Sequence, residues 1–466
     1  MCKHLFAALL DYTNKSQRSI HALLLAKSAP EALPIRKQAA QAPAARQAAA
    51  DKDAVSFVQL KEQAAHIPAL NITEWHMLFG QGAASLDNRT RNVQYVNDAL
   101  AAIDKLEPKL PLALKPIYQL HALLFVLDKL LNQVQSQALY YGSFIGFHTH
   151  SAASEVLNAI ERLFDHKLDI APDAEHWPRV TETIIYLRHK MLAQDKSSQY
   201  YTEPYYQLWT HWIQPAQSDT LLYRRELEHL RIAQKKLTTA KSLYTCTVAQ
   251  SWMHFYLSQD REALALLFTM KHNHELHPRE LLAFLRYLSH AEQWSRLVDW
   301  LVELSPLLGG RAYSGLDDYS EYWDQAVQQL PEAEKQMWDT LTSKLPNARS
   351  VYENKLLTYG KWRQWIDCQL SAGTDPLDYR VSVLAPIEKN APEVLIPYYH
   401  QAIERYVLLK NRDGYKAAVK LLKRLAKLYK KIKKEETWEL FFGTFRGRHS
   451  RLRALQEELR KGKLIS

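Results

Sequence analysis

The feature that most constrains the fold is a regular alternation of helix-length amphipathic stretches with short breaks, running from about residue 54 to about residue 400. The breaks carry prolines or polar turn residues, as in HIPALN, LEPKLP, DIAPDAEHWPR, TEPYY and IQPAQSD. Glycine accounts for only 13 of 466 residues, whereas proteins built of strands and tight turns need more of it. The sequence therefore predicts an all-α protein.

Similar phrases recur along this region. YLSQDREALALL from Tyr256 and YLSHAEQWSRLVDWL from Tyr287 begin 31 residues apart. Trp294 and Trp362 stand in similar contexts, and their separation of 68 residues is twice the period of about 34 residues that is typical of helical-hairpin repeats. A single hairpin cannot bury its apolar face, but stacked hairpins share one core. We therefore predict an α-solenoid of TPR-like helical hairpins.

Aromatic-rich stretches such as YYTEPYYQLWTHW are predicted to wedge between these helices. The alternative is that some of the rings line a concave groove.

Cysteine usage and hydropathy indicate a cytoplasmic protein. The three cysteines lie far apart and offer no disulfide framework, which favours a reducing compartment. The N-terminal run LFAALL is too short for a signal peptide. The longest apolar stretch, LALKPIYQLHALLFVLDKLL, carries Lys115, His121 and Asp128, so we expect no membrane span.

The histidine clusters do not form a recognisable catalytic motif. KHNHELHPRE holds His272, His274 and His277 but not HExxH, and FHTHSAAS, with His148 and His150, is expected to end a helix. There is no glycine-rich phosphate loop and no nucleophile elbow. We therefore expect no enzyme and no small-molecule substrate. A metal-dependent hydrolase at His272–His277 is a remote alternative.

The net charge of +10 is concentrated at one end of the chain. Residues 401–466 hold 19 Lys and Arg against 7 Asp and Glu, whereas residues 1–400 hold 41 against 43. A polyanionic partner, DNA or RNA, is therefore to be sought at the basic end.

The lysines of NRDGYKAAVKLLKRLAKLYKKIKK fall on one side of a predicted helix. At about 100° per residue they lie within about 40° of one line, because their spacing alternates between four and three. Leu421, Leu425, Leu428 and Ile432 point the opposite way and are predicted to meet a core. The predicted stripe consists of Lys416, Lys420, Lys423, Lys427, Lys430 and Lys434, flanked by Arg424 and Lys431.

A second basic helix is predicted in ETWELFFGTFRGRHSRLRALQEELRKGKL, with Arg446, Arg448, Arg451 and Arg453. Two successive basic helices favour contact with phosphates. The alternative is a solvated surface on which the like charges are simply tolerated.

The N-terminus contains two side chains that zinc prefers. Cys2 and His4 stand at the start of an apolar helix predicted over residues 4–26, but a closed structural zinc site needs four ligands. The segment from residue 26 to residue 53, rich in Ala, Gln and Pro, has almost nothing large enough to anchor a core and is predicted to be a linker.

The two ends together resemble the bacterial SWIM zinc-finger family, in which a C-x-C…C-x-H motif precedes a helix, a long helical region and a basic end. CKHLFAALLDY is similar to the second half of that motif, and NRDGYKAAVKLLKRLAKLYKK…RGRHSRLRALQEELRKGKL is similar to the closing segment. The resemblance makes Cys2 and His4 the third and fourth zinc ligands. It also implies a C-x-C pair upstream of Met1, so that this chain, with two of four ligands, would hold zinc poorly. Family membership implies DNA or protein partners and an association with helicase-like ATPases.

We thus expect four parts: residues 1–27 as half of a finger with its helix, 28–53 as a linker, 54–400 as a helical-repeat region and 401–466 as a basic helical segment. The expected function is that of a zinc-finger-related protein that meets nucleic acid at its basic end. The alternative is a non-catalytic helical scaffold that binds a protein partner and has no nucleic-acid role.

Overall fold

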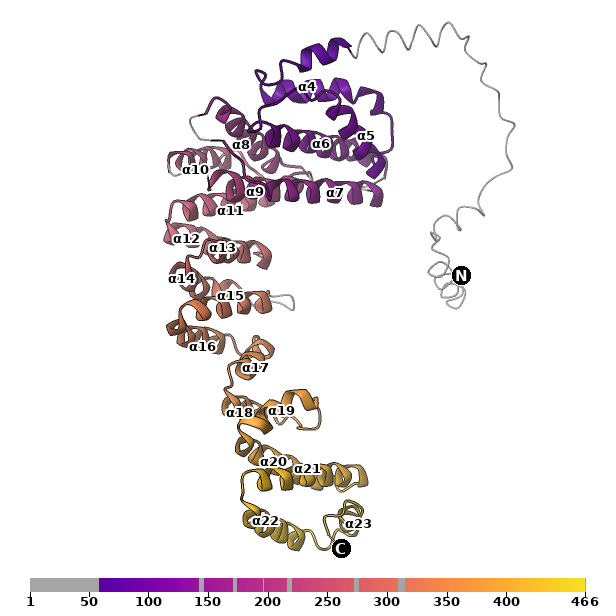
Figure 1. Ribbon diagram of the computed structural model, residues 1–466, viewed down its shortest axis with the longest axis vertical. Coiled ribbons are helices and arrows are strands. Elements are labelled where there is room, and N and C mark those ends of the chain that lie inside the picture. Colours follow the sequence, from indigo (N-terminus) through magenta and orange to yellow (C-terminus); the bar gives the residue numbers. More distant parts are fainter. Residues whose placement is uncertain are drawn as a thin grey trace, which may run out of the picture. The chain divides into compact units, whose positions relative to one another are not determined.

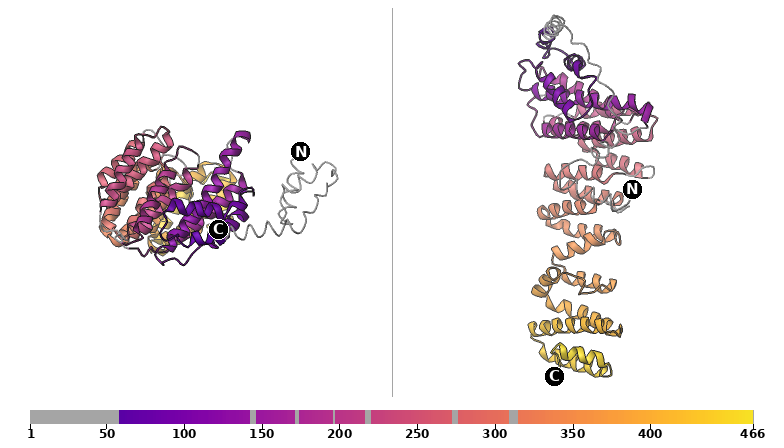
Figure 2. Two further views of the ribbon diagram at one scale, coloured as in Figure 1. Left: turned by 90° about the horizontal axis from the view of Figure 1, so that it is seen from above. Right: turned by 90° about the vertical axis from the view of Figure 1, so that its right-hand side faces the viewer.

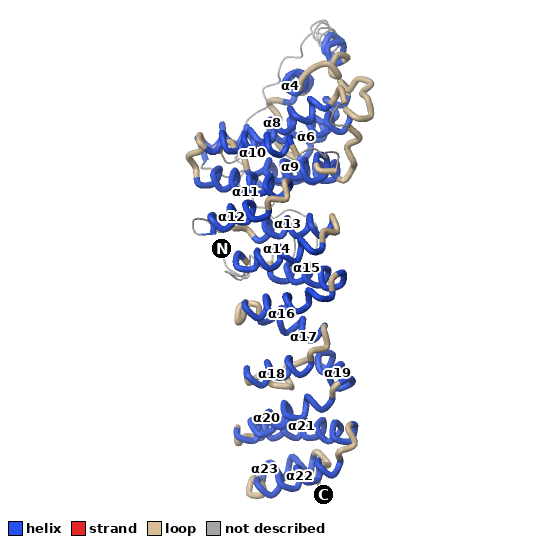
Figure 3. The backbone as a smooth tube through the Cα atoms, turned by 90° about the vertical axis from the view of Figure 1, so that its left-hand side faces the viewer, coloured by secondary structure: helices blue, strands red, loops and turns tan. Residues whose placement is uncertain are grey.

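The computed structural model describes residues 58–141, 146–170, 174–195, 197–215, 220–271, 276–308 and 315–465. Over these ranges the chain is helical and contains no strand, which confirms the all-α prediction (Figure 3). Residues 1–27 and 28–53, to which we assigned the half-finger and the linker, lie outside the described ranges. The chain divides into two compact units, the first ending at Leu187 and the second beginning at Arg188.

The first unit is built around one long helix. The helices are α4 (Ile72–Gly82), α5 (Val93–Asp104), α6 (Lys115–Tyr141), α7 (Phe147–Phe164) and the part of α8 (Trp177–Met191) that precedes the division, with the short η1 (Ala84–Leu86) after α4. The central helix α6 packs against α4, α5 and α7 (Figure 1). Its residues Leu120, Leu124 and Leu127 are fully buried. Among the described helices, none is long and apolar enough to cross a membrane.

The second unit is a succession of helical hairpins that follow one another in chain order (Figures 1 and 2). Each helix packs chiefly on its neighbours in sequence, as the solenoid prediction requires. The helices are α9 (Gln199–Gln207), the π-helical η2 (Leu208–Ile213), α10 (Leu221–Gln234), α11 (Ala240–Tyr256), α12 (Asp260–Lys271), α13 (Pro278–His290), α14 (Trp294–Leu304), α15 (Leu316–Gln329), α16 (Glu334–Ser343), α17 (Arg349–Thr358), α18 (Trp362–Ala372), α19 (Val381–Asn390), α20 (Leu395–Leu408), α21 (Arg412–Lys431), α22 (Glu435–Arg448) and α23 (Arg453–Lys461). Short 3-10 turns lie between some of them, namely η3 (Ser305–Leu307), η4 (Pro331–Ala333) and η5 (Pro392–Val394).

One turn recurs inside the hairpins and explains the similar contexts of Trp294 and Trp362, which each follow it by two residues. Ser258, Glu292 and Gly360 have left-handed backbone angles, with φ of 56°, 54° and 67°, and they lie 34 and 68 residues apart. The amide of the following residue donates in each case to a carbonyl five residues earlier, which is the Schellman arrangement that ends a helix. These bonds are Gln259 N to His254 O at 2.9 Å, Gln293 N to Leu288 O at 2.9 Å and Lys361 N to Leu356 O at 2.8 Å.

The intermediate turn in this series is missing because α15 runs on to Gln329 and ends at the Leu330–Pro331 step. Proline cannot continue the helix with a backbone hydrogen bond, so the break falls there instead.

Polar contacts between neighbouring hairpins recur at a similar spacing. Several join side chains or backbone groups that are 35 to 38 residues apart, and two of the charged members, Glu226 and Lys355, are only 3% and 6% exposed. The contacts are Arg188 with Glu226, Tyr244 with Glu280, Arg296 with Asp260, Ser289 with Gln325, and Lys355 with the carbonyl of Ser320.

The predicted break at TEPYY is wrong. Pro204 lies inside α9, and the chain stays helical through the π-helical turn η2 that follows. Trp209 and Trp212 in this segment are buried, as predicted for rings that wedge between helices.

The basic end belongs to the same array as the helices before it. Residue 400, which we expected to separate the repeat region from the basic segment, lies inside α20. One hydrophobic cluster extends from Leu356 on α17 to Leu459 on α23 and includes Leu421 and Leu425 of α21. The basic helices α21 to α23 are therefore held in place by the hairpins that precede them.

Candidate nucleic-acid interface

The lysine-bearing helix α21 is fixed at its start and along one face. The side chain of Asn411 caps it by accepting a hydrogen bond from the amide of Gly414 at 2.7 Å. Leu421 and Leu425 are fully buried, and Leu428 is nearly so. The helix cannot rotate without exposing these leucines, and its opposite face is therefore presented to solvent.

That opposite face carries a row of lysines. Lys416, Lys420, Lys423, Lys427 and Lys430 are all exposed, at the helical spacing predicted from the sequence. With a rise of about 1.5 Å per residue, the row is about 21 Å long. We call these five residues the lysine row.

The sixth lysine predicted for the stripe does not continue the row. The helix ends at Lys431, and Lys433 takes a left-handed backbone angle with φ of 57°. Lys434 is exposed, but it lies at the start of α22 rather than on α21.

Most of the lysine row has no ion-pair partner among the residues that the structure describes. Lys416 forms an ion pair with Asp413 at 3.1 Å, and the carboxylate of Asp413 is itself 93% exposed. Within the described part of the chain, no carboxylate lies within 4.0 Å of the other four ammonium groups. Carboxylates of the described residues therefore neutralise little of the positive charge of the lysine row.

The two flanking cations are engaged in the fold. The ammonium group of Lys431 donates to the backbone oxygens of Glu388 and Lys389, the latter at 3.3 Å. Arg424 is partly buried near the hydroxyl of Tyr399. Burial raises the pKa of Tyr399 most, the carboxylate of Glu388 raises it further, and the Arg424 guanidinium lowers it.

Of the four arginines predicted after α21, one is ion-paired within the fold and three are not. The guanidinium of Arg448 pairs with Glu404 of α20 at 2.6 Å. Arg446, Arg451 and Arg453 are exposed and, as far as the structure is described, have no carboxylate within 4.0 Å. Three of the four predicted arginines therefore add accessible positive charge next to the lysine row's helix, and one is partly neutralised.

The predicted metal-binding candidates are largely outside the described ranges. This holds for Cys2, His4, His272 and His274, while His277 is the exposed residue just before α13. Among the residues that are described, there is no group of three or more His, Cys, Asp or Glu side chains arranged to hold a metal ion.

Two further expectations concern single residues. His148 and His150 lie in the first turn of α7 and not at the end of a helix, so that prediction is wrong. Cys246 and Cys368 are free thiols, and burial raises the pKa of both.

Sequence patterns could not identify the partners that neutralise part of this surface. The contact between Arg448 and Glu404 joins residues 44 positions apart, and Lys431 bonds to backbone oxygens 42 and 43 positions away. Local periodicity carries no information about such contacts, because they depend on how consecutive hairpins stack.

Comparison with protein-family models gave no match, and no solved structure matched this chain. Among curated proteins, the chain is similar to YwqB of Bacillus subtilis strain 168, which is described as uncharacterised. The two are 25% identical over 384 residues, which covers 78% of this chain and 67% of YwqB.

Proposed function

We propose that this protein binds nucleic acid through the lysine row of α21, assisted by Arg446, Arg451 and Arg453. The proposal includes membership of the SWIM zinc-finger family, with Cys2 and His4 as two of four zinc ligands, cytoplasmic action and cooperation with a helicase-like ATPase. It includes no catalytic activity.

The observation that carries the proposal is the lysine row, five exposed lysines of which four have no carboxylate partner within the described structure, on a helix that its apolar face holds in place. Consecutive lysines in the row are three or four residues apart. Each such like-charge pair destabilises a helix by about 0.2–0.5 kcal/mol. The four consecutive pairs in the row therefore oppose folding by about 1–2 kcal/mol in total.

A phosphate backbone removes this repulsion and releases counterions on binding. Because lysine contacts phosphate as a point charge, binding through the row has little sequence preference. The same row would accept DNA or RNA, and its length of about 21 Å covers several phosphates of one strand.

The second candidate function is that of a scaffold for a protein partner. A solenoid made of hairpins offers a long surface for such a partner, and the lysine row would then be solvated or docked on an acidic surface. This alternative predicts no binding to nucleic acid at any salt concentration.

A salt titration separates the two functions. The protein is titrated against a short fluorescein-labelled DNA duplex, and anisotropy is measured between about 50 and about 200 mM salt. If the five lysines of the row are the only side chains that contact phosphates, the logarithm of the affinity falls against the logarithm of the salt concentration with a slope of about −4.5, and each arginine that also contacts a phosphate adds about −0.9 to the slope of the wild type and of the variant alike. The triple variant Lys420→Gln, Lys423→Gln and Lys427→Gln should lower that slope to about −1.8.

A matched control removes three exposed lysines of the second unit that are outside the row, Lys235, Lys236 and Lys335. This control variant should leave the slope unchanged. Absent binding at low salt, or the same slope for both triple variants, rejects the nucleic-acid function.

The zinc part of the proposal has a separate test in the genomic codons upstream of Met1. An in-frame C-x-C pair there supports the finger, and its absence rejects the family assignment without affecting the lysine row.

A further inference from the structure

The middle of the second unit has the opposite charge from its basic end. Residues 259–340 contain 14 Asp and Glu against 7 Lys and Arg. Exposed carboxylates of this section include Asp317 and Asp318 at the start of α15. Since these charges repel phosphate, the section around α12 to α16 is a poor surface for nucleic acid and a favourable one for a cationic partner.

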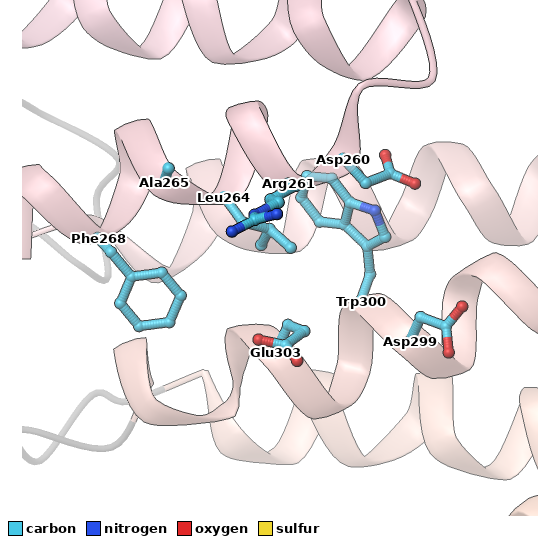
Figure 4. A pocket seen from close by; sticks show the side chains of 8 residues that line it. All are labelled: Asp260, Arg261, Leu264, Ala265, Phe268, Asp299, Trp300 and Glu303. Carbon is cyan, nitrogen blue, oxygen red and sulfur yellow. The ribbon is translucent and has the colours of Figure 1, made fainter.

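Within this acidic section a groove lies between α12 and α14, with a volume of about 440 Å³. Figure 4 shows that Leu264 and Phe268 of α12 project toward α14, while Glu303 and Asp299 extend from α14. The groove therefore has an apolar wall on one helix and two carboxylates on the other.

The two carboxylates are available to a ligand. Asp299 and Glu303 are exposed, lie one helical turn apart and, within the described ranges, have no cation within 4.0 Å. Asp260, in contrast, is held by Arg296, whose Nε lies 2.8 Å from a carboxylate oxygen. The carboxylates of Asp299 and Glu303 on α14 are therefore left to attract a ligand, whereas the charge of Asp260 is neutralised by Arg296.

A second feature of the groove also points to a missing partner. The indole of Trp300, which is only 1% exposed, stands between α12 and α14 in Figure 4. Its Nε1 has no hydrogen-bond acceptor among the described residues. A buried indole N–H usually has an acceptor, so this donor beside the groove is left unsatisfied, and a backbone carbonyl of a bound chain reaches it only if the side chains around the indole move apart.

We propose that the groove between α12 and α14 binds an extended, arginine-bearing segment of a partner protein. A guanidinium places planar donors against the carboxylates of Asp299 and Glu303. Its alkyl stem packs along Leu264 and Phe268, as long cationic side chains do on apolar surfaces. Arg261, the one cation in the wall, lies between Phe268 and Asp260 along α12 in Figure 4, so the incoming guanidinium must pass on the α14 side of it.

The test uses a fluorescein-labelled hexa-arginine peptide as the probe and the full chain as the protein. The wild type should bind the peptide. The double variant Asp299→Asn, Glu303→Gln should bind it at least about tenfold more weakly, because two charges are lost at the contact. The matched control Glu321→Gln, Glu332→Gln removes two exposed carboxylates from the same acidic section but outside the groove. It should change the affinity less than about twofold.

A third variant tests the shape of the site without changing its charge. Ala265 is exposed and lines the groove, so Ala265→Trp should fill the groove and weaken peptide binding while circular dichroism stays unchanged. The variant with Gln at Lys420, Lys423 and Lys427 should bind the peptide like the wild type, which separates this site from the nucleic-acid surface.

Several results would overturn the proposal. These are absence of peptide binding by the wild type, equal weakening by the groove pair and the control pair, and full binding by Ala265→Trp. Self-association of the wild type that disappears in the Asp299→Asn, Glu303→Gln variant would identify the basic end of a second copy as the occupant and would equally overturn binding of a separate protein.

Discussion

The buried ion pair between Arg188 and Glu226 gives the sharpest test of how neighbouring hairpins depend on each other. The carboxylate of Glu226 is 3% exposed, pairs with the Arg188 guanidinium and accepts a hydrogen bond from the hydroxyl of Tyr205 at 2.8 Å. Replacing Arg188 with Met keeps the apolar stem but leaves this carboxylate without its cation. We expect a large loss of stability in α10 that depends on pH.

The size of the expected loss of stability depends on whether the buried Glu226 carboxyl stays ionised or becomes protonated. Burial raises the pKa of Glu226 above its ordinary value of 4.5, and Arg188 is the strongest influence that lowers it. Without Arg188 the folded state keeps Glu226 protonated, and protonating such a carboxyl costs about 3.4 kcal/mol at pH 7 and about 0.8 kcal/mol at pH 5. The deficit relative to the wild type is thus bounded by about 3.4 kcal/mol at pH 7 and shrinks as the pH falls toward 4.5.

Hydrogen exchange measured by mass spectrometry on peptides from α10 reports the free energy of local opening without assuming that the whole chain unfolds in one step. The control is Arg349→Met, which breaks the ion pair with Glu353, where the arginine side chain is 46% exposed. This control should change local stability by no more than about 1 kcal/mol. A deficit in the Arg188→Met variant that is the same at both pH values would refute the reasoning, as would a loss no larger than that of the control.

Two further predictions concern the turns and the core of the first unit. Glu292→Gly should raise the free energy of unfolding of α13 and α14 by about 1 kcal/mol, because φ at this position is 54° and glycine adopts it without a clash. The control Glu321→Gly, inside α15, should lower the free energy of unfolding by about as much. Urea denaturation followed by circular dichroism measures both changes, and no gain from Glu292→Gly would contradict the assignment of strain. His121 is fully buried between His76 and Thr183, with ring nitrogens 3.0 Å from each partner, and burial first and His76 second lower its pKa well below 6.5. The unfolded chain therefore binds a proton that the folded state does not, and the first unit should lose up to about 1.4 kcal/mol per pH unit below about pH 6.5. Hydrogen exchange of α6 at pH 7 and pH 5 should show this loss, and His121→Gln should reduce it.

The parts of the fold that the sequence predicts correctly are those that depend on local periodicity. The lysine row and the buried leucines of α21 both follow from helical spacing alone, since 3.6 residues per turn decides which side chains share a face. The similar contexts of Trp294 and Trp362 likewise reflect a local cause, since each tryptophan follows a left-handed turn residue by two positions. The phrases at Tyr256 and Tyr287 do not, because they are 31 residues apart and the turns at Ser258 and Glu292 are 34 apart.

The parts that sequence analysis misses depend on backbone angles or on distant residues. A left-handed residue is usually glycine, but Lys433 takes this conformation and ends α21 one turn earlier than the lysine spacing implies. Pro204 is expected from the sequence to break a helix, but it lies inside α9, and the chain stays helical after it. The contact between Arg448 and Glu404 and the groove between α12 and α14 exist only once hairpins have stacked.

The side chains that join neighbouring hairpins are different at each junction, with a carboxylate at Glu226 and an ammonium group at Lys355. Arrays whose units meet through uniform apolar faces can gain or lose a unit during evolution with little penalty. In this chain, deleting the codons of one hairpin would place two hairpins in contact whose facing side chains are not complementary. A charged side chain would then be buried at the new interface without its partner. Natural variation in the length of the second unit should therefore be found at its ends, whereas the order and number of the internal hairpins should be preserved.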